Sequence, residues 1–263
     1  MAYENILLNV SPEGTAVLTL NRPQKRNALN GDVISELTDA FETLSKNPEC
    51  RLVLIRGNGP VFSAGADLEW MRAAQHYSSG ENEEDAYAMA EMLRRLFELP
   101  QATIAILHGA AMAGACGIAA ACDIAIARKG TVFSFSEVKL GIIPATISPY
   151  VINAIGPRWA RALFVTADRF EADVAAKIGL IHHEVEDETA MERLVEHYAD
   201  LVYAASPAAI ADTKDLVSTV TGEIIDASLG HMTAKRLAHR RVSDQGREGL
   251  AAFLEKRKPS WAR

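Results

Sequence analysis

The stretch that decides the fold is Phe62-Ser63-Ala64-Gly65-Ala66-Asp67-Leu68, which follows the apolar run Leu52-Val53-Leu54-Ile55. A short apolar run that leads into a glycine-containing loop is typical of a buried strand. Side chains this small let a ligand approach the main chain closely, so the peptide N–H groups are the useful atoms. Asp67 begins a helix-like segment, whose first N–H groups favour negative charge. The pattern predicts a site for a phosphate or an oxyanion, with a plain turn as an equal alternative at this point.

A second junction of the same kind follows later in the chain. Residues 102–107 are apolar and predict another buried strand, and residues 108–123 consist mostly of glycine and alanine, with Met112, Cys116 and Ile118 among the larger exceptions. Small residues at helical spacing allow close packing, and a strand-to-helix junction presents free N–H groups. Two such junctions can direct two peptide donors at one carbonyl oxygen. Loss of one donor from such a hole costs ~10²–10³ in rate.

The composition excludes several function classes. With 263 residues, of which 49% are hydrophobic, the chain is expected to form one large domain, with or without a small appendage. Its net charge of −7 argues against a nucleic acid as the main partner. Three cysteines without zinc-like spacing predict neither a metal site nor a disulfide framework. No apolar run is long enough for a membrane span, and no basic leader precedes the first strand pattern, so we expect a cytoplasmic protein.

The order of the local patterns indicates the organisation of the chain. Residues 4–10 and 15–20 predict paired strands, and residues 32–45 predict a helix capped by Asp32. Strand-like and helical stretches alternate to about residue 185, as in βαβ units. Residues 76–85 are polar and predict a mobile exposed loop. Beyond residue 188 the pattern is helical.

Five ordered motifs resemble the crotonase superfamily, the enoyl-CoA hydratases and isomerases, over nearly the whole chain. They lie at residues 21–29 (NRPQKRNAL), 63–67 (SAGAD), 114–123, 136–144 (SEVKLGIIP) and 248–258. Residues 62–71 and 136–170 look most like bacterial methylglutaconyl-CoA hydratases of leucine and isoprenoid breakdown. The resemblance implies an α/β fold with a spiral of ββα units over residues 1–187 and a helical trimerisation region over residues 188–263. It also implies a homo-trimer or a hexamer.

The resemblance also assigns roles to individual residues. It implies that the N–H groups of Ala64 and Gly114 hold the thioester oxygen and that Glu137 is the acid/base. A glutamate in an apolar pocket has a raised pKa, which suits this role. CoA enters as part of an acyl-CoA substrate, without a separate cofactor, and its expected contacts are Lys25, Ala28, Leu29, Ala66, Asp67, Leu68 and Lys256.

One departure from the family leaves the reaction open. Two-glutamate hydratases carry their other glutamate at the position of Gly117. Trp70, Gly117 and Pro144 are expected to line the acyl pocket, where Arg72 or Lys139 would pair with a distal carboxylate. The leading hypothesis is hydration of 3-methylglutaconyl-CoA or a similar branched 2-enoyl-CoA. The alternatives are a Δ3-Δ2-enoyl-CoA isomerase that uses Glu137 alone, a non-catalytic acyl-CoA-binding protein, and other chemistry of the superfamily such as thioester hydrolysis.

Overall fold

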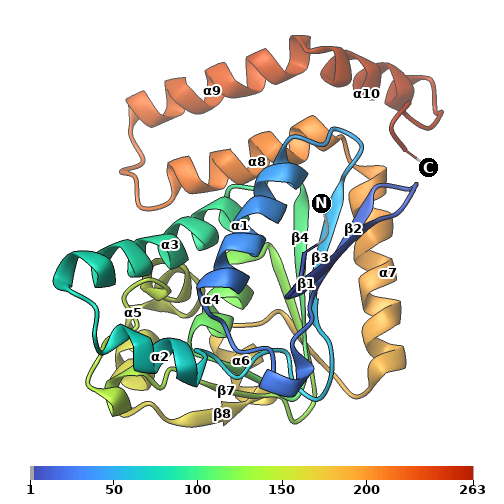
Figure 1. The fold of residues 1–263 in the computed structure, drawn as a ribbon. Helices are drawn as coiled ribbons and strands as arrows, with labels where there is room; N and C mark the ends of the chain where they lie inside the picture. Colours follow the sequence, from blue (N-terminus) through green and yellow to red (C-terminus); the bar gives the residue numbers. More distant parts are fainter. Residues whose placement is uncertain (1–2, 263) are drawn as a thin grey trace.

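The computed structural model describes residues 3–262 and contains two sheets surrounded by helices (Figure 1). The larger sheet has the order β1-β2-β3-β4-β6-β9, in which only the β1–β2 pair is antiparallel. Its strands are β1 (Ile6–Val10), β2 (Thr15–Leu20), β3 (Leu52–Gly57), β4 (Ala102–Leu107), β6 (Ile124–Arg128) and β9 (His183–Val185). The expected paired strands near the start and the α/β class are therefore confirmed.

Side-chain alternation along the strands gives the larger sheet two apolar faces. Val53 and Ile55 of β3 point into the main core, whereas Leu52 and Leu54 point to a smaller cluster on the other face. Successive residues of a strand point to opposite sides, so a continuous apolar run such as residues 52–55 indicates a strand covered on both faces. The main core lies on the side of α1 (Gly31–Ser45), α3 (Ser79–Phe97) and α4 (Gly114–Ala121).

The smaller sheet lies next to the start of α4. It has the order β5-β7-β8, with β5 (Ala110–Met112) parallel to β7 (Val132–Ser134) and β8 (Arg169–Glu171) antiparallel to β7. The remaining elements before the C-terminal helices are η1 (Pro23–Lys25), α2 (Leu68–Ala74), η2 (Glu137–Leu140), α5 (Ser148–Thr166) and α6 (Ala172–Ile178). Figure 1 places α2 and this sheet at one end of the molecule.

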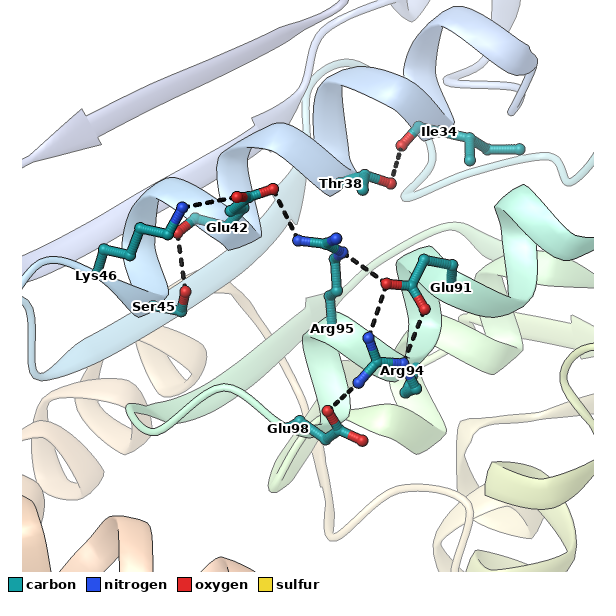
Figure 2. A network of polar contacts seen from close by, with 9 residues as sticks. All are labelled: Ile34, Thr38, Glu42, Ser45, Lys46, Glu91, Arg94, Arg95 and Glu98. Atoms are coloured by element: carbon teal, nitrogen blue, oxygen red, sulfur yellow. Dashed lines mark hydrogen bonds and ion pairs between the residues drawn. The ribbon is translucent and has the colours of Figure 1, made fainter.

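Helix α3 is anchored on α1 by ion pairs as well as by apolar packing. Arg95 of α3 binds Glu42 of α1 at 2.8 Å and Glu91 of its own helix at 2.8 Å (Figure 2). Glu91 also pairs with Arg94, which contacts Glu98 in turn. Below this network Met92, Leu93 and Leu96 are fully buried. The C-terminal half of α3 is therefore fixed against the core. Because the helix is continuous, this also fixes the earlier residues of α3 that lie on its core-facing side.

The C-terminal region is helical, as the sequence predicts. It consists of α7 (Glu188–Ala204), α8 (Pro207–Val220), α9 (Ala227–Val242) and α10 (Asp244–Leu254). Met191 and Val202 of α7 belong to the smaller apolar cluster, so α7 covers the second face of the large sheet. Helices α9 and α10 lie at the opposite end of the molecule from α2 (Figure 1). The division at residue 188 and the trimerisation role remain predictions.

Two local predictions are wrong. The α1 helix is capped by Asn30, whose side chain accepts from the Val33 N–H at 3.0 Å, and Asp32 lies in its first turn. Much of the polar stretch at 76–85 is not a loop, because α3 begins at Ser79. The Ser78 hydroxyl and the Glu81 carboxylate each bond to the backbone N–H of the other residue, which satisfies donors at the helix start. No helix within residues 3–262 has the length and apolar character needed to cross a bilayer.

Candidate active site

Backbone pairing brings the two glycine-containing junctions together. Ser63 forms a parallel bridge with Ala111: the Ser63 N–H donates to Ala110 O at 3.0 Å, and the Met112 N–H donates to Ser63 O at 3.2 Å. Ala66 lies three positions after Ser63, and Gly114 lies three positions after Ala111. Gly65 lies so close to the second junction that an added Cβ would be 3.2 Å from Met112 O. The sequence expectation that the two junctions converge is met by this pairing.

The N–H group that is available in the first junction is that of Ala66 and not, as expected, that of Ala64. The Ala64 N–H donates to Arg26 O at 2.9 Å and is therefore occupied. Ala66 forms a parallel bridge with Leu29, which uses Gly65 O and the Asp67 N–H. In a parallel bridge the N–H of the central residue points to the other side. Within residues 3–262 no internal hydrogen bond uses the Ala66 N–H, and Ala66 is exposed.

The expected second donor is the N–H of Gly114, the first residue of α4. The first N–H groups of a helix have no partner within the helix, and the helix dipole favours negative charge there. The preceding residue, Ala113, has φ 50° and ψ −114°. This conformation is strained for a residue with a Cβ and occurs chiefly where function requires it. No internal hydrogen bond of the described residues uses the Gly114 N–H.

Residues of the first motif, 21–29, hold the loop that carries Ala66 in place. Arg22 binds the Asp67 carboxylate at 3.0 Å and Ala28 O at 2.7 Å. Asn27, itself buried, donates to Asn58 O at 2.8 Å and Val61 O at 3.0 Å. Although burial opposes the charge on Asp67, the Glu69 N–H and the Arg22 guanidinium lower the pKa of its carboxyl group. Sequence reasoning did not single out Arg22 and Asn27, because nothing in their spacing identifies these partners.

The position of Glu137 suits a proton carrier. It begins η2 directly after the small sheet, and its Oε2 is buried without a hydrogen-bond partner among the described residues. Burial raises the pKa of Glu137. The pKa of the buried Cys116 thiol is raised, chiefly by burial and further by the charge of Glu137. Because Cys116 belongs to α4, this interaction places Glu137 beside that helix. An unpaired buried carboxylate is costly, so its persistence near α4 favours a catalytic role.

The position of the absent second glutamate is closed by apolar side chains. A Cβ on Gly117 would lie 2.4 Å from Cγ2 of Ile147 and 3.3 Å from Cδ1 of Leu93. Ile147 is fully buried before the start of α5. The site therefore has no space for a carboxylate side chain at position 117.

We expect Gly117→Ala to lower the free energy of unfolding by about 1–3 kcal/mol, because the added methyl group must displace the branched Ile147 side chain. The matched control is Gly80→Ala in the first turn of α3, where an added Cβ meets nothing within 4 Å and the helix gains propensity of up to ~1 kcal/mol. Urea unfolding of both variants provides the comparison. A Gly117→Ala variant as stable as the wild type would contradict the packing argument.

The predicted CoA contacts differ in their exposure and in whether other protein groups already bind them. Lys25 is partly exposed beside α2, where it pairs with Glu69 at 3.1 Å. Ala28 and Leu29 are buried, and Leu29 lies against Gly114. The Asp67 side chain is buried, and both its carboxylate and its N–H are engaged within the protein, so its expected contact with CoA remains a prediction. Leu68 is exposed.

Lys256 is not brought to this site by its own chain. It follows α10, which Figure 1 places at the opposite end of the molecule from α2. Its expected contact with CoA therefore requires a second copy of the chain, and it remains a prediction.

Two of the expected acyl-pocket residues are at least partly buried, whereas one of the two expected cations is engaged by the backbone and the other is exposed. Trp70 is partly buried against the core and Pro144 is buried near Ile147. The Lys139 ammonium donates to Ala167 O at 2.7 Å, and Arg72 is exposed on α2. The structure adds a residue that sequence reasoning missed: Asp85, whose Oδ1 accepts from the Trp70 indole at 2.9 Å. Asp85 lies in the stretch that was predicted to be a mobile loop.

Comparisons with known proteins identify the family of the chain. A sequence model of the family described as enoyl-CoA hydratase/isomerase matches residues 11–263. A crotonyl-CoA hydratase from Syntrophomonas wolfei is 33% identical, over 99% of this chain and 99% of its own. A solved enoyl-CoA hydratase from Shewanella pealeana is 38% identical with a TM-score of 0.95, over 98% of this chain and 96% of its own. An enoyl-CoA hydratase/isomerase from Marinobacter aquaeolei is 33% identical with a TM-score of 0.92, over 98% of this chain and 99% of its own.

Proposed function

Because the chain belongs to the enoyl-CoA hydratase/isomerase family of the crotonase superfamily, we propose that it adds water to a 2-enoyl-CoA thioester. The observation that carries the proposal is the buried, unpaired Oε2 of Glu137 beside the helix whose first N–H, that of Gly114, is free. Two amide donors and one acid are the groups that conjugate addition to a thioester requires. The relatives with hydratase names support the same reaction.

In this proposal the thioester oxygen binds the N–H groups of Ala66 and Gly114, which withdraws electron density from C3 of the acyl group. Glu137 takes a proton from water while the water oxygen forms a bond to C3. The π electrons of the C2=C3 bond move into an enolate, whose oxygen the two amides stabilise most strongly. Glu137 then returns its proton to C2, so one carboxyl group acts first as base and then as acid. Its raised pKa makes it a stronger base for the first transfer and lies nearer the working pH, as suits a group that takes up a proton and returns it.

The acyl group that we propose is short and branched. Branched and aromatic residues follow the Ile143-Pro144 element, and Ile147 reduces the space beside Gly117. The sequence hypothesis extended to 3-methylglutaconyl-CoA, which carries a distal carboxylate. The contacts of Lys139 and Arg72 give no support to that carboxylated substrate, so we favour a neutral branched acyl group.

The second candidate function is a Δ3-Δ2-enoyl-CoA isomerase. The closed space at Gly117 favours it, because moving a proton between two carbons needs one carboxyl group and no water. Incubation in D2O with a 2-enoyl-CoA and a 3-enoyl-CoA, followed by NMR, distinguishes the reactions. Formation of the 3-hydroxyacyl-CoA is expected. Deuterium exchange and double-bond migration without hydration would support the isomerase, and tight binding without turnover would support a non-catalytic acyl-CoA-binding protein.

We also propose that the chain assembles as a homo-trimer or a dimer of trimers through its C-terminal helices. Exposed apolar side chains are frequent between α8 and the end of α10, namely Ile224, Ile225, Leu237, Val242, Leu250, Phe253 and Leu254. Apolar surface of this kind marks contact sites.

A further inference from the structure

Asp85 lies on the face of α3 that reaches the second amide donor. It precedes Met89 by four positions, so the two side chains share one helix face. Met89 is buried, and its Cε lies 2.9 Å from the position that a Cβ on Gly114 would take. One helical turn spans ~5.4 Å. Met89 thus contacts the residue that carries the second N–H, and Asp85 lies one turn of α3 before Met89 on the same helix face.

The Trp70 indole holds Asp85 between two helices. Trp70 belongs to α2, which starts two residues after the donor Ala66, and its Nε1–H donates to Asp85 Oδ1 at 2.9 Å. Asp85 is partly buried there, whereas the neighbouring Glu83 and Glu84 are exposed. Burial raises the pKa of Asp85, and the indole N–H opposes this shift. The bond fixes a carboxylate at the edge of the site, on the side where α2 and α3 meet.

The charge of Asp85 is not balanced by a cation within residues 3–262. None of the ion pairs found there includes Asp85. Of the two cations that were expected to receive a distal carboxylate, Lys139 donates to Ala167 O, and Arg72 is exposed on α2 and forms no ion pair with Asp85. A second carboxylate in this space would meet an unneutralised negative charge. Like charges placed together at an interface disfavour a wrong partner strongly.

We propose that Asp85, positioned by Trp70, determines the acyl specificity of the site by rejecting acyl groups that end in a carboxylate and accepting neutral groups of the same size. This inference rests on the proposed function, because it takes the acyl group to extend from the Ala66 and Gly114 donors. The distal end of that acyl group is taken to lie on the side where α2 and α3 meet, because Trp70 and Met89 link Asp85 to the two junctions. The repulsion acts on the distal end and not on the reacting carbons.

The test compares two matched thioesters on three proteins. The neutral 3-methylpent-2-enoyl-CoA has a methyl group where 3-methylglutaconyl-CoA has its carboxylate. For the wild type we expect kcat/KM to favour the neutral thioester by at least ~10-fold. Asp85→Asn keeps an acceptor for the Trp70 indole and removes the charge, and it should reduce the preference to about threefold or less. Glu84→Gln removes the same charge from the exposed side of α3 and should leave the preference unchanged.

A binding measurement separates this inference from the proposed function. Calorimetry with the saturated analogues, 3-methylpentanoyl-CoA and 3-methylglutaryl-CoA, gives the same preference without turnover. Failure of the wild type to convert any enoyl-CoA would contradict the proposed function, while the ratio of the two Kd values would still test Asp85. The inference is overturned if the wild type prefers the carboxylated ligand, or if Asp85→Asn leaves the ratio unchanged. It is also overturned if that variant loses more than about tenfold in kcat on the neutral thioester, because Asp85 would then act in turnover.

Discussion

Replacement of Glu137 by glutamine is expected to lower kcat by ~10²–10⁴-fold, because the amide keeps the size of the side chain but cannot carry a proton. Oε2 of Glu137 is buried without a hydrogen-bond partner, so the substitution leaves no neighbouring protein donor without its acceptor. The affinity for a saturated acyl-CoA should stay within about threefold of the wild type, since the proposed binding groups are amides of other residues. Steady-state kinetics together with calorimetry measure the two effects separately.

The control for this substitution is Glu171→Gln. Glu171 is exposed on β8, which pairs with β7 in the small sheet just before Glu137. Its kcat should equal that of the wild type. A Glu137→Gln variant that retains more than about a tenth of the wild-type kcat would exclude Glu137 as the proton carrier.

The same variant is expected to be more stable than the wild type at neutral pH. Burial raises the pKa of Glu137 above its ordinary value, so the folded protein disfavours the ionised carboxylate. The destabilisation is therefore absent below the unfolded pKa, grows as the pH rises towards the folded pKa, and is complete above it. Thermal unfolding should give Glu137→Gln the higher Tm at neutral pH and equal Tm values near pH 4. A higher Tm for the wild type at neutral pH would contradict this assignment.

Removal of the Ala66 N–H is expected to lower kcat/KM by ~10²–10³-fold, the effect typical of one lost donor to an oxyanion. An ester in place of the amide, made by incorporating lactic acid for alanine at position 66, removes the donor and keeps the methyl side chain. It also weakens Gly65 O, which accepts from the Leu29 N–H at 2.7 Å. Enzyme kinetics on the purified ester protein give the effect on the transition state.

The ester at position 64 provides the matched control. It weakens Ser63 O, which accepts from the Met112 N–H at 3.2 Å, and it removes the Ala64 donor to Arg26 O. The expected cost is a structural hydrogen bond, about 0.5–1.5 kcal/mol of stability, with kcat/KM within a few-fold of the wild type. A larger kinetic loss at position 64 than at position 66 would return the donor role to Ala64.

Much of the fold was predictable because its signals are local. The apolar run at residues 52–55 alternates between two covered faces, and the glycine-containing segments after β3 and β4 do lie side by side. The motif at residues 136–144 singled out Glu137, which the structure places at the start of η2. These features depend on residue size and sequence order, which a single sequence displays.

The choice of donor and the closed pocket were not predictable in the same way. Ala64 and Ala66 have the same side chain and differ in their backbone partners: the Ala64 N–H donates to Arg26 O, whereas no internal hydrogen bond of the described residues uses the Ala66 N–H. From the sequence, Gly117 indicates only that a glutamate is absent, and the structure shows that Ile147 occupies the space of a side chain at this position. Asp85 was hidden in a polar stretch because its partner, Trp70, belongs to another helix. Long-range contacts decide each of these cases.

The most direct test of the account is a crystal structure of the protein with a saturated branched acyl-CoA. The thioester oxygen should lie about 2.7–3.1 Å from the nitrogen atoms of both Ala66 and Gly114, with Oε2 of Glu137 facing C2 and C3 of the acyl group. A thioester oxygen that contacts neither amide, or a Glu137 carboxylate that turns away from the acyl carbons, would contradict it.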